Sequence, residues 1–370
     1  MQKEIIVIGD IEMGTGNITD DFISDRALSG LILSLKDRKH PVDLVLNGDT
    51  FDFLKAPYKL TPKPIYTRYV TEEVALAKLR LVFNAHRGVF DALKKFAEAE
   101  CKEIYFIIGN HDLELAFSAV KKEIKKMLGK HVHFPGLVYR KHRVYVEHGH
   151  QYDFATVINP RRLFVDHNGK KILNNTFISF TIISALIPLK EEHPFLERIK
   201  PIPHLLSFYR PVGKKVNRRV ASYFVKSMLY YPLRYYADPT YTFPSKFIQE
   251  FFSRIGTLDW EIADIVSRFK KRKLRKEKIY VLGHIHDKYV EETQKRVILR
   301  PGSWRDEYYL DEGYLFPRRK RYVQIIVDDG GKLDWNLVAY PIKRSSLKFY
   351  DVVRDEERFV EMARKEEGYE

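Results

Sequence analysis

Short apolar runs alternate with longer stretches of helical periodicity through the first 150 residues, and this alternation limits the fold more than any other feature. The runs at 4–8, 42–46 and 103–108 are rich in β-branched residues, and each ends in a Gly-Asp or Gly-Asn pair. Apolar residues recur every three or four positions at 22–35, 72–99 and 114–128, which predicts helices. Strands that alternate with helices predict an α/β fold, with helices on the faces of a layered sheet.

The β pattern continues through 137–146 and returns near the end of the chain. Strands are expected there at 279–282, 296–299, 321–327 and 335–340. The acidic tail at 351–370 has the periodicity of one amphipathic helix. The two ends of the chain therefore have the same α/β character.

The middle of the chain differs in charge. Residues 154–278 hold 24 Lys and Arg against 10 Asp and Glu, a net charge of +14 out of +15 for the whole chain. Frequent prolines predict short helical pieces there. We expect one body formed by 1–153 and 279–370, with 154–278 as a mainly helical, basic and aromatic-rich insertion. Large insertions enter surface loops beside working sites more readily than other places.

Composition excludes several classes of protein. Apolar residues make up 45% of the 370 positions, which excludes a disordered chain. The single cysteine, Cys101, excludes an internal disulfide and a thiolate metal cluster. We see neither a signal peptide nor an apolar run long enough for a membrane helix, so the expected location is cytoplasmic. The charge of +15 predicts an anionic partner.

Polar residues of one chemical kind follow the predicted strands. They are Asp10 and Glu12; Asp49; Asn110, His111 and Asp112; His148 and His150; and His284 and His286. The carboxyl ends of strands are where α/β folds place their sites. Oxygen and imidazole donors without sulfur suit divalent ions such as Mn²⁺, Fe²⁺ or Zn²⁺.

In this order, the strings Asp10-x-Glu12, Gly48-Asp49-x-x-Asp52, Gly109-Asn110-His111-Asp112, His148 and Gly283-His284-x-His286 resemble the calcineurin-like metallophosphoesterase superfamily. The resemblance covers the body and implies a layered β-sandwich core flanked by helices. It also implies hydrolysis of phosphoester or pyrophosphate bonds by metal-activated hydroxide. The body would then be the catalytic domain.

The resemblance further implies two divalent ions, with Mn²⁺ expected and Fe²⁺, Zn²⁺ or Mg²⁺ as alternatives. One ion would be held by Asp10, Asp49 and His286, and the other by Asp49, Asn110, His148 and His284. Asp49 would bridge them, because two neighbouring cations repel unless anionic oxygens lie between them. His111 would protonate the leaving oxygen, and Asp112 would orient it.

Glu12 departs from the family pattern, which has histidine at this position. Glutamate either replaces the imidazole as an oxygen ligand, which favours a harder ion such as Mn²⁺ or Mg²⁺, or it points away and leaves the first ion with fewer ligands.

The remaining polar residues near the motifs have less specific roles. The pattern selects His148 over His150, so His150 is expected to support a ligand or to face phosphate. Arg161 and Arg162 either reach a substrate phosphate or are solvated charges at the start of the insertion. Asp52 and Asp153 are expected to support the ligands.

The insertion leaves three interpretations open. The apolar segment at 177–189 and the aromatic residues beside cations at 228–236 suit an anionic membrane surface, single-stranded nucleic acid, or a helical subdomain with its own aromatic core. Gly-Asp-Thr-Phe-Asp-Phe at 48–53 and His-Gly-His-Gln-Tyr-Asp at 148–153 are most similar to the UDP-2,3-diacylglucosamine diphosphatase branch. A phosphorylated, lipid-linked or nucleotide-linked substrate is therefore expected, with peripheral attachment to a membrane. The alternatives are a metal-dependent nuclease and a non-catalytic scaffold.

Overall fold

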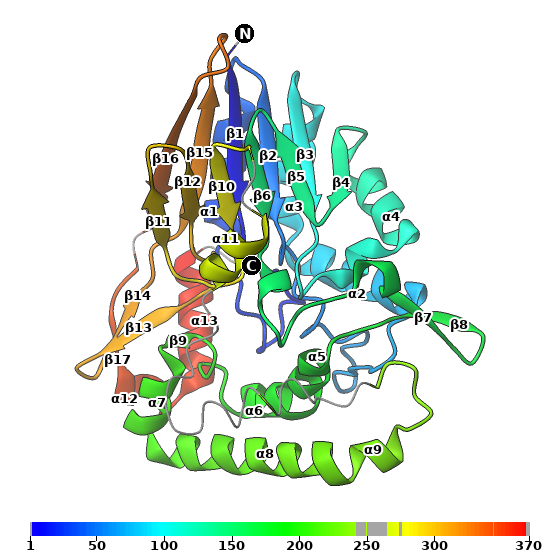
Figure 1. Cartoon of the computed structure of the whole chain (residues 1–370). Coiled ribbons are helices and arrows are strands. Elements are labelled where there is room, and N and C mark those ends of the chain that lie inside the picture. The colour runs from blue at the N-terminus through cyan, green and yellow to red at the C-terminus, as the bar shows by residue number, and fades with distance from the viewer. Residues whose placement is uncertain (1, 242–248, 250–264, 274–275, 343, 368–370) are drawn as a thin grey trace.

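Two β-sheets stack face to face at the centre of the molecule, with helices on their outer faces (Figure 1). The computed structural model describes residues 2–241, 249, 265–273, 276–342 and 344–367. The predicted α/β class and the layered sandwich are both confirmed.

The first sheet has six strands in the order β16-β15-β1-β2-β3-β4, and its last four strands run parallel. β15 and β16 extend it with antiparallel pairing beside β1. The strand bounds are β1 (Lys3–Ile8), β2 (Val42–Asn47), β3 (Lys102–Ile107), β4 (Val132–Gly136), β15 (Arg321–Val327) and β16 (Leu333–Ala339).

The second sheet has five strands in the order β11-β12-β10-β6-β5, with β10 parallel to both of its neighbours. The bounds are β5 (Val138–Lys141), β6 (Val144–Glu147), β10 (Ile279–Leu282), β11 (Tyr289–Glu292) and β12 (Val297–Arg300). The single strand predicted at 137–146 is instead the β5–β6 hairpin, because His142 and Arg143 adopt left-handed backbone angles that reverse the chain.

Alternating residues of β1 show why its apolar run is unbroken. Ile5 and Val7 pack against the second sheet, whereas Ile6 and Ile8 pack under the helices. A strand covered on both faces needs apolar side chains at every position. The helices over this outer face are α1 (Asp25–Lys36), α2 (Glu72–Ala85), α3 (Arg87–Glu98) and α4 (Ser118–Leu128), and α11 (Ile265–Lys273) covers the second sheet.

Two predicted helices are each divided in the structure. The helix expected at 72–99 breaks at His86, whose backbone leaves the helical region between α2 and α3. The tail expected as one helix forms α12 (Phe349–Val352) and α13 (Glu356–Glu367). In both places the periodicity is continuous across the break, so it predicted the buried face but not the interruption.

The insertion is helical through most of its described part and includes one further β-hairpin. Its elements are η3 (Pro160–Arg162), β7 (Phe164–His167), β8 (Lys170–Leu173), α5 (Phe177–Thr181), η4 (Ile182–Leu186), α6 (Ile187–Glu192), β9 (Ile199–Lys200), α7 (Ile202–Phe208), α8 (Arg210–Leu229), α9 (Tyr231–Arg234) and α11, which packs on the second sheet. α8 runs along the edge of the molecule, on the far side of α5 and α6 from the sandwich (Figure 1). In the described ranges, no helix is long and apolar enough to cross a membrane.

The insertion shares a hydrophobic core with the C-terminal part of the chain. Leu189, Phe195 and Leu205 pack with Tyr308 and Phe349. β9 also joins a small sheet with β13 (Tyr308–Asp311), β14 (Tyr314–Pro317) and β17 (Leu347–Lys348). The division at 154 and 278 stays a prediction, but this core ties its two sides together.

Candidate metal centre

Five loops bring the predicted ligands together at one edge of the sandwich. β1, β2 and β3 run parallel in one sheet, and β6 and β10 run parallel in the other. The residues that follow these strands are Asp10, Asp49, Asn110, His148 and His284. Strands that run in the same direction end at the same edge, where α/β folds place ligand-binding residues.

One group of donor atoms converges on His148. Its Nε2 lies 3.0 Å from Asp49 Oδ2 and 3.1 Å from Asn110 Oδ1. Asp49, His148 and His284 each offer a ligand atom, and all three atoms lie within 4.8 Å of one another. A carboxylate, an amide oxygen and two imidazoles at this spacing fit one divalent ion.

A second group gathers around Asp10. Its Oδ1 lies 3.7 Å from His286 Nε2 and 3.9 Å from His148 Nδ1. Asp10 Oδ2 is buried and has no hydrogen-bond partner among the described residues. Because a buried carboxylate oxygen is costly when nothing neutralises it, this atom also fits a metal ligand.

The backbone is strained where it presents these ligands. Asp10, Asp49 and His284 have φ of 52°, 48° and 70°, in the left-handed region that costs a non-glycine residue about 1–3 kcal/mol. Gly109 allows the close approach of two loops, because a Cβ there would lie 2.1 Å from Asp49 Oδ1. The glycines of the motifs therefore admit the ligands as well as ending the strands.

Carboxylates and a backbone carbonyl contact a ring nitrogen of three of these histidines. His284 Nε2 lies 3.0 Å from Asp153 Oδ2, and His286 Nδ1 lies 2.6 Å from Glu307 Oε1. His148 Nδ1 lies 3.0 Å from the carbonyl of Asn47. Such contacts fix the ring orientation and the nitrogen offered to a metal. Sequence reasoning anticipated a supporting role for Asp153 but missed Glu307, which belongs to no motif.

Opposite charges compensate one another in this buried cluster. Burial alone would raise the pKa of the Asp49 carboxyl, but His148 and His111 hold that pKa well below its usual range. Burial likewise disfavours a charged His148, yet Asp49 and Asp10 raise its pKa to about 9. The carboxylate is thus ionised, as a metal ligand must be.

The predicted partnership of His111 and Asp112 is wrong. Asp112 accepts hydrogen bonds from the backbone N–H groups of Thr50 and Gly109, at 2.8 and 2.7 Å, and so fixes two motif loops. The carboxylate that contacts the His111 ring is Asp52, with Oδ1 2.8 Å from Nδ1. Burial disfavours the imidazolium, but Glu12, Asp49 and Asp52 raise the pKa of His111 to about 10, so it is protonated near neutral pH.

Glu12 points into the cluster. Its Oε1 lies 3.4 Å from His286 Nε2, and Glu12, Asp49 and His111 form a second set of side chains spaced closely enough to hold an ion. Its oxygens also contact two cationic side chains: Arg305 at 3.1 Å and Lys55 at 3.2 Å. Glu12 therefore does not point away from the cluster, and its carboxylate faces both a predicted ligand and two cations.

The predicted substrate-binding residues lie elsewhere. His150 packs beside His148, with ring centroids 5.4 Å apart, but it is buried and offers no open face to a substrate. Arg161 and Arg162 are exposed on η3, and no described hydrogen bond or ion pair joins either side chain to a predicted ligand. The structure thus brings the predicted metal ligands together but not the predicted phosphate contacts.

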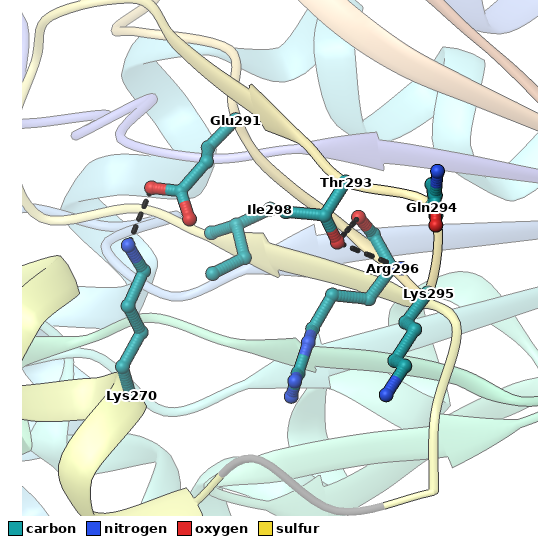
Figure 2. A pocket seen from close by; sticks show the side chains of 7 residues that line it. All are labelled: Lys270, Glu291, Thr293, Gln294, Lys295, Arg296 and Ile298. Atoms are coloured by element: carbon teal, nitrogen blue, oxygen red, sulfur yellow. Dashed lines mark hydrogen bonds and ion pairs between the residues drawn. The ribbon is translucent and has the colours of Figure 1, made fainter.

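A separate surface hollow of about 490 Å³ lies at the β11–β12 hairpin (Figure 2). It is lined by Lys270, Glu291, Thr293, Gln294, Lys295, Arg296 and Ile298. Lys270 pairs with Glu291 across it. None of the predicted site residues lines this hollow, so the convergence of donor atoms, rather than the cavity, marks the centre.

Among comparisons with known proteins, the match to a family model supports the resemblance. The chain matches the family described as calcineurin-like phosphoesterase over residues 4–288. No curated protein matches it significantly. Among solved structures, a conserved Streptococcus pneumoniae protein described as a predicted phosphoesterase is 12% identical, with 94% of this chain and 98% of that one covered and a TM-score of 0.26. A single-residue variant of Vps29 from Entamoeba histolytica is 9% identical, with 91% and 99% covered and a TM-score of 0.27.

Proposed function

The chain belongs to the calcineurin-like phosphoesterase family, and we propose that it hydrolyses a lipid-linked or nucleotide-linked phosphoester or pyrophosphate at a membrane surface. As a member of this family it is a metal-dependent hydrolase of phosphoester bonds. The observation that carries the proposal is the convergence of Asp49, Asn110, His148 and His284 at the end of parallel strands. This arrangement favours catalysis over a scaffold role.

Two divalent ions, with Mn²⁺ preferred, would occupy the centre. Asp49, Asn110, His148 and His284 would hold the second, and Asp10, Asp49 and His286 the first. Such ions lower the pKa of water and offset the negative charge of a phosphoryl group. Protonated His111, held by Asp52, would donate its proton to the leaving oxygen.

The test is a hydrolysis panel in Mn²⁺ beside metal analysis of the purified protein. Aryl phosphates, UDP-linked lipids, cyclic nucleotides and single-stranded DNA would be compared, with Asp49→Ala as the inactive variant. Asp334→Ala, at an exposed position of β16, is the matched control. We expect Asp49→Ala to lose metal and activity together. An Asp49→Ala protein that keeps its ions and its rate would defeat the proposed centre.

A stripe along α8 and α9 supports the membrane surface. We define the α8 stripe as Arg210, Lys214, Arg218, Val225 and Leu229, whose helical spacing places them along one face of α8, together with Leu233 of α9 and Tyr236 just beyond it. The four apolar members are 54%, 69%, 77% and 85% exposed, in chain order. No acidic residue occurs between Arg198 and Asp238. A helix with cations and exposed apolar side chains suits an anionic membrane interface.

The apolar segment at 177–189 is not the exposed one. Phe180, Ile187 and Leu189 are buried, and the Arg68 guanidinium lies 3.7 Å from the Phe180 ring centroid. The segment forms α5, η4 and α6, and its buried residues pack against the body as well as within the insertion. The membrane proposal therefore rests on the α8 stripe instead.

Vesicle and oligonucleotide binding, each measured from low to high salt, separates the membrane from nucleic acid. Apolar insertion persists at high salt, whereas phosphate contacts on DNA weaken steeply. We expect binding to anionic vesicles that survives salt and is lost in the double variant Leu229→Asp, Leu233→Asp. Met362→Asp, at a 40% exposed position of α13, is the control. Steeply salt-dependent DNA binding without vesicle binding would instead support the nuclease.

A further inference from the structure

Two buried cationic side chains bind the carboxylate of Glu12, at the position where the sequence departs from the family pattern. Arg305 Nη1 donates to Oε1 at 3.1 Å, and Lys55 Nζ donates to Oε2 at 3.2 Å. All three side chains are buried. Each oxygen of Glu12 therefore already has a charged donor.

These cations belong to a larger buried network. Lys55 Nζ lies within 3.4 Å of four carboxylates: Glu12, Asp21, Asp52 and Glu197. Arg305 also donates to Asp21. Lys190, from α6 of the insertion, pairs with Asp21 and with Glu197 at 2.9 Å. Removing one member would leave its partners charged and buried, which is strongly unfavourable.

The network explains why a carboxylate stands where the family has an imidazole. A neutral imidazole would remove one of the carboxylates that face Arg305 and Lys55, and each cation would lose a charged acceptor. A divalent ion bound to the same oxygens would lie within a few ångströms of two positive groups. Like charges at that distance repel strongly inside a protein.

The second ion's ligands have different surroundings. Asp49 contacts the His148 ring and the backbone N–H of His111, at 3.0 and 2.8 Å. His284 is supported by the Asp153 carboxylate. The backbone N–H is neutral and the His148 ring can lose its proton when a metal binds, whereas the Arg305 and Lys55 groups at Glu12 stay charged, so the two positions differ in kind.

We infer that Glu12 holds Arg305 and Lys55 instead of a metal, and that the chain binds one divalent ion tightly, at Asp49, Asn110, His148 and His284. The position at Asp10 and His286 then fills only at high metal concentration. This inference rests on the proposed centre. It assigns Glu12 to the network that joins the body to the insertion.

Metal stoichiometry tests the inference without any assay of activity. We expect wild-type protein to retain one Mn²⁺ per chain after dialysis, and to bind a second at least ~100-fold more weakly, the upper part of the range for lost metal support. Its Mn²⁺ electron paramagnetic resonance spectrum should be that of an isolated ion. Glu12→Gln should keep the single tight ion but unfold at a lower temperature, whereas Asn110→Ala should lose that ion.

Two tight, magnetically coupled ions in the wild type, one of them lost in Glu12→Gln, would overturn the inference and make Glu12 a ligand. If Asn110→Ala keeps its metal, the proposed centre itself fails, which is a separate result. Glutamine has nearly the shape of glutamate, so Glu12→Gln is expected to fold. Circular dichroism checks this before metal is measured. If it does not fold, the wild-type stoichiometry and spectrum still decide between one tight ion and two.

Discussion

His111 and Asp112 are neighbours in the chain, yet they serve different parts of the centre. Asp112 fixes two backbone loops, whereas His111 is paired with Asp52 and stands beside Asp49. His111, Glu12 and Asp49 are also spaced closely enough to hold an ion. Whether His111 donates a proton or binds a metal is therefore the decisive question at the scale of single residues.

Replacing His111 with alanine separates these roles. As a positioned acid it should leave the bound metal unchanged and lower the rate by roughly 10²–10⁴-fold. The loss should be greatest for substrates with poor leaving groups and least for nitrophenyl esters, which need little protonation. Asp52→Asn should give a smaller loss with the same dependence. Metal analysis that shows an ion missing from His111→Ala would make His111 a ligand.

At the scale of elements, His86 secures the loop that carries Asp10 and Glu12. It stands at the junction of α2 and α3, with Nε2 3.0 Å from Asp20 and Nδ1 2.9 Å from Asp25. Asp20 in turn accepts the backbone N–H groups of Gly14, Gly16 and Phe22. One buried imidazole thus joins the helix break to the loop after β1.

This contact makes stability depend on pH. Burial disfavours the imidazolium, but Asp20 and Asp25 raise the pKa of His86 to about 9. Because its pKa is raised in the folded state, protonated His86 stabilises the fold. This contribution is complete below the ordinary pKa near 6.5 and is lost as pH rises through 9. Urea unfolding of wild type and His86→Gln should differ by roughly 3 kcal/mol more at about pH 6 than at about pH 10. His204→Gln, at an exposed position of α7, is the control. An equal difference at both pH values would contradict the role of the charge.

At the scale of the whole molecule, Arg68 fastens the body to the insertion. Its guanidinium lies between the rings of Phe180 and Tyr235, at 3.7 and 4.3 Å, and its Nε donates to Asp238 at 2.8 Å. The buried network around Lys55 and the core shared with β13 join the same two parts. Three kinds of contact thus hold the insertion against the body.

Arg68→Ala should lower the local stability of the insertion more than that of the sandwich. Loss of a partly buried ion pair with ring contacts should cost roughly 2–4 kcal/mol. Hydrogen exchange should then rise in α5 and α9 while β1 to β3 stay protected. Arg80→Ala, at an exposed position of α2, should change neither region. Uniform loss of protection would show that the two parts unfold as one.

Most of the sandwich strands, and the residues proposed as ligands, could be read from the sequence, although the β5–β6 hairpin was predicted as one strand and β11 was not predicted. Both are local signals, because an apolar run that meets glycine and then Asp, Asn or His is written in consecutive residues. Parallel strands then place those residues at one edge. Thus Asp10, Asp49, Asn110 and His148 could be selected without knowledge of the fold.

Which side chains meet across long separations in the chain became known only from the fold. Arg305 and Glu12 are 293 positions apart, and no local pattern pairs them. Lys190 and Asp21, and Glu307 and His286, are likewise brought together by packing. Composition left open whether 177–189 is buried or faces a membrane; the structure buries Phe180, Ile187 and Leu189, and exposed apolar side chains lie on α8 instead. Burial and charge pairing depend on what surrounds a residue in space, which its neighbours in sequence do not specify.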